Sequence, residues 1–163
     1  MPSEVLARAP GAGRPRLLKG RERERGSALL YAALWITLGS ALGGMGRYLV
    51  SGLVARRFGE TFPLGTLTVN VVGSFVIGFA ATFGGPGAHA LGGHEFDVLA
   101  VRQFVMTGIC GGFTTFSSFS LQTLNLLRDG EGWAAAWNVL LSAGLCFIST
   151  AAGLFAGLAL SPP

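Results

Sequence analysis

The chain has 163 residues, of which 50% are hydrophobic and only 12% are charged, and its mean hydropathy is +0.55. In soluble domains roughly a quarter of all residues are charged. Here long apolar stretches separate a few charged clusters. This composition excludes a soluble single-domain enzyme and a chain that is disordered over most of its length. It predicts an all-α membrane protein that crosses the bilayer several times.

The net charge of +4 comes mainly from the N-terminal segment. Seven of the 12 Lys and Arg residues lie before Gly26, in a stretch rich in Pro, Gly and Arg. Nucleic-acid binding is an alternative role for these cations, but no folded module or aromatic platform accompanies them. We predict that residues 1–27 form a basic, disordered tail on the cytoplasmic side, where it meets anionic lipid.

Four stretches are long and apolar enough to cross a membrane, at about 20 residues per crossing. They cover about residues 28–54, 64–83, 102–127 and 133–160, so residues 28–160 are expected to form one transmembrane domain of four helices. With four spans the N- and C-termini share one side, and the tail cations place that side in the cytoplasm. Without the tail, the remaining cations would barely favour either orientation.

The interiors of the predicted spans contain neutral polar residues and no Asp or Glu. This pattern argues against a proton-coupled pump or drug antiporter, which needs an ionisable group in the substrate path. Neutral polar side chains can hydrogen-bond an ion without titrating. In the second span they are Thr66, Thr68 and Asn70, and in the fourth they are Asn138, Ser142, Ser149 and Thr150.

The third span holds the least helix-like segment, residues 108–120. Gly111 and Gly112 precede five hydroxyl residues, and both kinds of residue disfavour a helix. A break in mid-membrane releases carbonyls that need another helix, water or a cation as partner. The alternative is close packing through GxxxG pairs such as Gly108/Gly112 and Gly39/Gly43, which does not explain the hydroxyls. We predict a break near mid-membrane and an ion site there.

Two phenylalanines follow the predicted break. Phe116 and Phe119 are three residues apart, so they share one face of a helix. The edge of a phenyl ring is positive, and Asn70 and the hydroxyls add hydrogen-bond donors. Donors without a fixed cation suit a small, strongly hydrated anion. The residues alone predict a narrow polar anion pathway, with ordinary core or lipid-facing aromatics as the alternative.

Three motifs, in this order and spacing, resemble those of the Fluc-type (CrcB) fluoride channels. They are GMGRY at residues 44–48, FPLGTLTVN at residues 62–70 and GGFTTFSSFS at residues 111–120. The resemblance extends over about residues 29–160. It implies a four-helix subunit that forms an antiparallel dimer of the dual-topology type, with two fluoride pores along the dimer interface. The partner is a second copy or a paralogue of opposite orientation.

The resemblance also implies roles for individual residues. Asn70, Phe116 and Phe119 match residues that line the family's fluoride pathway. Ser142 matches a serine of a polar track on the fourth helix, and Thr66 lies one helical turn before Asn70.

A second group of residues is implied to hold a cation or to shape the pathway. The carbonyls of Gly111 and Thr114 from both subunits are expected to bind one structural Na+ that is not transported. Arg47 resembles the arginine near the end of the family's first helix.

The chain departs from the family pattern at three positions. Asn138 and Cys146 stand, with Ser142, at i, i+4, i+8 spacing where the family has a Tyr and two Ser. Gln122 stands where many relatives have Glu, so the titratable group is absent there.

The resulting hypothesis is a plasma-membrane channel, not an enzyme, that lets cytoplasmic fluoride leave passively and so confers fluoride resistance. HF enters as a neutral molecule and dissociates in the cytoplasm, and the membrane potential then drives the anion out. One alternative is a small four-helix multidrug exporter, but its Glu in the first span is missing, since residues 29–46 are uncharged. The other is a non-conducting structural subunit of a membrane complex.

Overall fold

The computed structural model describes residues 16–82 and 100–160. Contacts within the chain define two units, Met1–Tyr31 and Ala32–Pro163. The described part of the first unit is the beginning of helix α1 (Arg16–Phe58), so this helix starts within the segment predicted as a tail. The second unit contains all the other elements.

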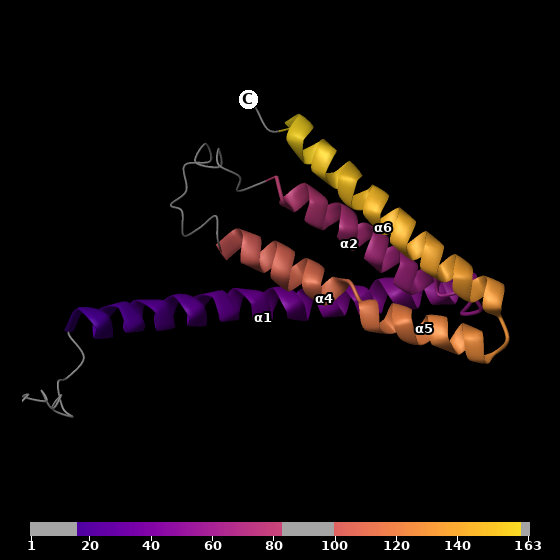
Figure 1. The fold of residues 1–163 in the computed structure, drawn as a ribbon, viewed down its shortest axis with the longest axis horizontal. Helices are drawn as coiled ribbons and strands as arrows, with labels where there is room; N and C mark the ends of the chain where they lie inside the picture. Colours follow the sequence, from indigo (N-terminus) through magenta and orange to yellow (C-terminus); the bar gives the residue numbers. More distant parts are fainter. Residues whose placement is uncertain (1–15, 83–99, 161–163) are drawn as a thin grey trace, which may run out of the picture. The chain divides into compact units, whose positions relative to one another are not determined.

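All regular elements in the described ranges are helices, as the sequence predicted (Figure 1). They are α1 (Arg16–Phe58), α2 (Leu64–Ala80), the π-helix η2 (Gln103–Cys110), α4 (Gly111–Phe113), α5 (Phe116–Arg128) and α6 (Gly132–Leu160). The predicted linker between the second and third spans, residues 84–101, lies outside the described residues except for its last two, which are helical.

Three helical stretches of the described residues are long and apolar enough to cross a membrane. These are Arg25–Phe58, Ala100–Arg128 and Gly132–Leu160. The apolar helix α2 is shorter, at 17 residues. The chain is therefore a helical membrane protein, while the count of four spans stays a prediction.

Glycines in the left-handed region end two of the helices. Gly59 has φ 81° directly after α1, and Gly130 has φ 82° in the turn between α5 and α6. Only glycine adopts this conformation without a steric cost. The turn at Gly130 is closed by a hydrogen bond from Glu131 N–H to Leu126 C=O of 2.8 Å. It brings α6 back alongside α5.

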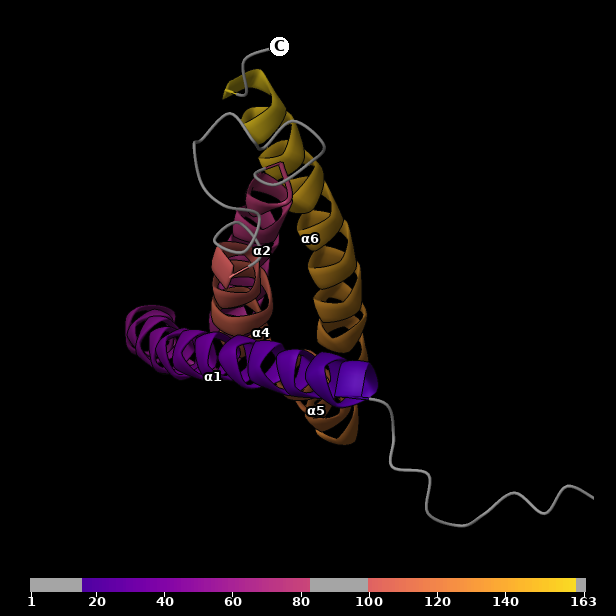
Figure 2. The ribbon, with the colours of Figure 1, turned by 90° about the vertical axis from the view of Figure 1, so that its left-hand side faces the viewer.

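Small residues allow α2 and α6 to pack closely side by side (Figure 1, Figure 2). A Cβ on Gly153 would meet the backbone of Phe75 and Phe79, and one on Gly78 would meet the backbone of Thr150. Ser149 Oγ also donates to Val71 C=O at 2.8 Å. Such close approach and interhelical hydrogen bonds are typical of membrane helix pairs.

The glycine pairs also join the second-unit part of α1 to the third span. Gly39 lies against Gly108, and Gly43 lies against the backbone of Ile109 and Phe113. Gly112 lies against the backbone of Ser40. The glycines of the GxxxG pairs therefore serve close helix packing, and this packing occurs together with the predicted break.

The third span is interrupted by two extended residues, as predicted (Figure 1). α4 ends at Phe113, Thr114 has φ −80° and ψ 155°, and Thr115 has φ −151° and ψ 112°. α5 then begins at Phe116. The break thus falls on the threonines and not on the Gly-Gly pair. The wide π-helical winding of Gln103–Cys110 before it was not predicted.

Candidate ion pathway at the helix break

Asn70 of α2 holds the broken segment of the third span by two hydrogen bonds to Thr115. Its Nδ2 donates to Thr115 C=O at 3.1 Å, and its Oδ1 accepts from Thr115 N–H at 2.7 Å. A carboxamide carries the same donor and acceptor as a peptide group. Asn70, which lies 45 positions away in sequence, therefore replaces the helical partner that Thr115 has lost.

Thr115 also caps the helix that follows. Its Oγ1 accepts from Ser118 N–H at 3.2 Å and donates to Ser118 Oγ at 3.1 Å, and the residue is only 7% exposed. The prediction named no role for Thr115. The signal was present in the sequence, because a threonine directly before a helix is a favoured N-cap.

The break leaves the last carbonyls before α5 without their helical donors, and those of Gly111 and Thr114 are among them. In a continuous α-helix Gly111 C=O would accept from Thr115 N–H, and Thr114 C=O would accept from Ser118 N–H. These two N–H groups instead donate to Asn70 Oδ1 and to Thr115 Oγ1. Gly111 and Thr114 are the residues whose carbonyls were expected to bind Na+, and carbonyl oxygens are suitable ligands for a hard cation.

A cavity of about 320 Å³ lies at the break. Four of the predicted site residues, Asn70, Gly111, Thr114 and Phe116, line it together with Thr115. The structure thus brings the residues that carry the amide, one ring and the two expected carbonyls to one cavity. Such a cavity can offer hydrogen-bond donors and ring edges to an anion, and carbonyl oxygens to a cation.

Phe116 and Phe119 form a ring pair at the start of α5. Their centroids are 5.4 Å apart and the ring planes are inclined by 47°. Phe116 is 79% exposed, whereas Phe119 is half-buried. Phe119 does not line the cavity at the break, so only the Phe116 ring of the predicted pair lies there.

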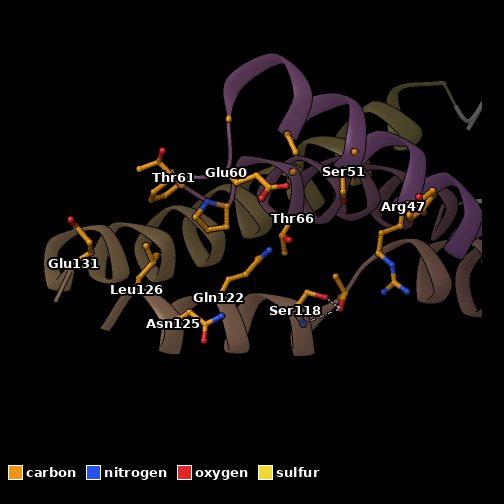
Figure 3. A pocket seen from close by; sticks show the side chains of 18 of the residues that line it. Arg47, Ser51, Glu60, Thr61, Thr66, Ser118, Gln122, Asn125, Leu126 and Glu131 are labelled. Atoms are coloured by element: carbon orange, nitrogen blue, oxygen red, sulfur yellow. Dashed lines mark hydrogen bonds between the residues drawn. The ribbon is translucent and has the colours of Figure 1, made fainter. Parts of the chain in front are cut away.

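A larger cavity of about 950 Å³ adjoins the other side of Thr115 (Figure 3). Arg47 and Thr66, two more predicted site residues, line it, and so does Gln122. Gln122 Oε1 is buried and has no hydrogen-bond partner among the described residues. Thr115 lines both cavities, and the two differ in charge: the wider one is lined by Arg47 and by the carboxylates of Glu60, Asp129 and Glu131, whereas the one at the break has no charged lining residue.

The fourth-helix residues lie apart from both cavities. Ser142 is buried at 8% exposure and Asn138 at 2%, and Cys146 is a half-buried free thiol. Asn138 Nδ2 donates to Thr123 Oγ1 of α5 at 2.8 Å, so its amide packs between two helices. None of the three residues lines either cavity described above.

The fold and the site define a small helical membrane protein in which a broken helix gathers uncharged donors and carbonyls around a cavity. The family model described as CrcB-like protein, Camphor Resistance (CrcB), matches residues 34–154. The chain belongs to this family, which confirms the resemblance seen in the three motifs. The matched region contains the break and all the predicted site residues.

Curated relatives are similar over almost their full length. A protein of Opitutus terrae named fluoride-specific ion channel FluC is 56% identical over 128 residues, covering 78% of this chain and 93% of the relative. Proteins of the same name from Methylocella silvestris and Rhodospirillum rubrum are each 51% identical, covering 71% of this chain and 85% of each relative.

Proposed function

We propose that this chain is the subunit of a fluoride channel that gives cytoplasmic fluoride a passive exit across the plasma membrane. Membership of the CrcB family and relatives named fluoride-specific ion channels support this function. The observation that carries it is the cavity at the helix break, which Asn70, Gly111, Thr114 and Phe116 line together. The protein acts as an ion channel and not as an enzyme.

Four helices of the chain cross the membrane in this proposal. The 17 residues of α2 span about 26 Å at 1.5 Å per residue. This is slightly less than the roughly 30 Å of a hydrocarbon core, and a mismatch of a few ångströms is tolerated by local thinning. With α2 as a crossing, both termini lie in the cytoplasm.

The subunit pairs with an inverted partner, either a second copy or a paralogue. Phe116 is 79% exposed on a single chain, and irregular backbone beside it cannot face lipid without partners for its polar groups. An antiparallel partner covers the break of each subunit with the same segment of the other. The pores then run along the dimer interface.

The carbonyls of Gly111 and Thr114 would hold a structural Na+ between the two subunits. Each subunit supplies two carbonyl oxygens that have lost their helical donors, and no charged side chain is needed. When bound, the cation supplies positive charge that ties the two broken segments together. It is not transported.

Fluoride exchanges its water for weak donors along the pathway. The positive ring edges of Phe116 and Phe119 and the amide of Asn70 contact the ion, with Thr66 as a further hydroxyl donor. Ser142, which lines neither cavity of the single subunit, would contribute only where the partner extends the pathway along α6. Since none of these groups is charged, the ion is held weakly enough to leave.

Ion efflux from proteoliposomes tests this function. Vesicles loaded with fluoride and chloride, with a K+ gradient and valinomycin to carry the compensating charge, should release fluoride and retain chloride. No proton gradient should be needed, because the pathway contains no coupling group. Release that depends on an imposed proton gradient would indicate an exporter, and no release from the pure protein would indicate a structural subunit.

Exchange of the cation tests the Na+ site. Protein dialysed and reconstituted in N-methylglucamine buffer should lose fluoride efflux, and added Na+ should restore it. Equal efflux in both buffers, with Na+ contamination measured and negligible, would contradict the site.

A further inference from the structure

Hydrogen bonds connect α6 to the backbone of Phe119. Asn138, which is 2% exposed, donates from Nδ2 to Thr123 Oγ1 at 2.8 Å. Thr123 Oγ1 donates in turn to Phe119 C=O at 2.8 Å. The hydroxyl accepts one hydrogen bond and donates the other, so the three residues form one continuous chain.

We propose that Asn138 is a positioning residue for the Phe119 ring and acts through Thr123. This inference rests on the proposed fluoride channel, in which the ring edges of α5 contact the ion. It differs from the expectation that Asn138 belongs to a polar track touched by fluoride. Asn138 lines neither cavity at the break, and its amide nitrogen is engaged with α5.

The broken helix explains why α5 needs such a connection. α5 begins after two extended residues, so no continuous ladder of backbone hydrogen bonds ties its rotation to the preceding helix. The Asn70–Thr115 pair fixes the second of these two residues, directly before α5. The bond from Asn138 fixes α5 two turns later, and Phe119 lies between the two fixed points.

The position of Phe119 determines the geometry of the ring pair. Phe116 and Phe119 lie 5.4 Å apart with their planes inclined by 47°. A rotation of α5 about its axis moves both rings together and turns their edges away from the pathway. Loss of the connection should therefore reduce fluoride conduction and also the discrimination between fluoride and the larger chloride ion.

A double-mutant cycle tests the connection. Asn138→Leu and Thr123→Val each remove it with little change in volume, and Thr123→Ser keeps the hydroxyl. Ser149→Ala is the matched control, since it removes a hydrogen bond of 2.8 Å from α6 to the neighbouring α2. Each variant is purified as a folded dimer, and its fluoride and chloride efflux is measured in proteoliposomes.

We expect Asn138→Leu and Thr123→Val each to lower the fluoride-to-chloride flux ratio about 3- to 10-fold. This factor corresponds to the free energy of an interhelical hydrogen bond in a membrane. The flux ratio of the double variant should be no lower than the lower of the two single-variant ratios. The ratios of Thr123→Ser and Ser149→Ala should match that of the wild type. Additive single effects, or a normal ratio in Thr123→Val with a reduced one in Asn138→Leu, would overturn the proposal. So would an equal loss in Ser149→Ala.

A second measurement is independent of conduction. With 4-fluorophenylalanine incorporated at position 119, the 19F NMR signal should shift in Asn138→Leu and in Thr123→Val, but not in Ser149→Ala. An unchanged signal in the first two variants would overturn the positioning role. A wild-type protein that passes no fluoride would instead refute the proposed function, and the NMR result would still decide the role of Asn138.

Discussion

At the scale of single residues, the break depends on the pairing between Asn70 and Thr115. The sequence predicted Asn70 as a hydrogen-bond donor to an anion. The structure adds that one amide hydrogen and the amide oxygen serve the backbone of Thr115. The second amide hydrogen remains for a ligand, so one side chain can both hold the break and contact the ion.

Replacing Asn70 should therefore affect stability as well as conduction. Asn70→Ala leaves Thr115 N–H unpaired and removes one of the hydrogen bonds to Thr115 C=O, at a cost of about 1–3 kcal/mol for a buried group. We expect a lower unfolding temperature in detergent and at least tenfold slower fluoride efflux. Thr37→Val is the control, because its exposed hydroxyl bonds only to its own helix. Wild-type stability and efflux in Asn70→Ala would contradict the role of Asn70 in holding the break.

Phe116 should affect conduction alone. Its ring is 79% exposed, so Phe116→Ile removes the positive ring edge without opening a core cavity. We expect fluoride efflux about 2- to 10-fold slower, from the 0.5–1.5 kcal/mol typical of a ring interaction. Phe147→Ile changes an equally exposed ring, also at 79%, on α6 and should leave efflux unchanged. Equal effects of the two variants would remove Phe116 from the pathway.

At the scale of elements, small residues on α1 determine how closely it approaches the third span. A methyl group on Gly43 would meet the backbone of Ile109 and Phe113, whereas one on Gly44 would meet nothing within 4 Å. Backbone atoms cannot move aside as a side chain can.

Gly43→Ala and Gly44→Ala form a matched pair of variants. Gly43→Ala should destabilise the protein by about 1–3 kcal/mol, as overpacking typically does. Gly44→Ala should be neutral or slightly stabilising, because Ala favours the helix. Thermal unfolding of both in the same detergent measures the difference. Equal unfolding temperatures would show that α1 does not pack here as described.

The sequence predicted the helices and the break, but not how the break is held. Hydroxyls and a Gly-Gly pair marked residues 108–120 as poor helix material, yet both glycines stay helical, and Gly112 packs against Ser40 of α1. Thr114 and Thr115 unwind because Asn70, distant in sequence, satisfies the second threonine. The π-helical winding of η2 likewise depends on tertiary packing and has no signature in composition.

At the scale of the whole molecule, the charge of the N-terminal segment is predicted to determine the orientation in the membrane. Seven cations precede Gly26, whereas Arg56, Arg57 and Arg128 lie on the opposite side of a four-span topology. The positive-inside rule then predicts that one orientation dominates. An antiparallel dimer requires both orientations, so the tail favours an inverted paralogue as partner.

Neutralising the tail should mix the two orientations. The variant has all seven tail cations replaced by Gln and carries Glu131→Cys as a reporter. An impermeant maleimide should label this cysteine from both sides of the membrane. With the native tail it should be labelled from the outside only. Arg56→Gln with Arg57→Gln is the control, and it should strengthen the native orientation. A single orientation in the neutral-tail variant would exclude the tail as its determinant.

Current through a planar bilayer that contains the purified protein tests the central claim most directly. With fluoride gradients imposed and Na+ on both sides, the reversal potential should follow the fluoride equilibrium potential. It should not move when a chloride or proton gradient is added. A reversal potential that follows protons or chloride, or the absence of any current, would contradict a passive fluoride pathway at the broken third helix.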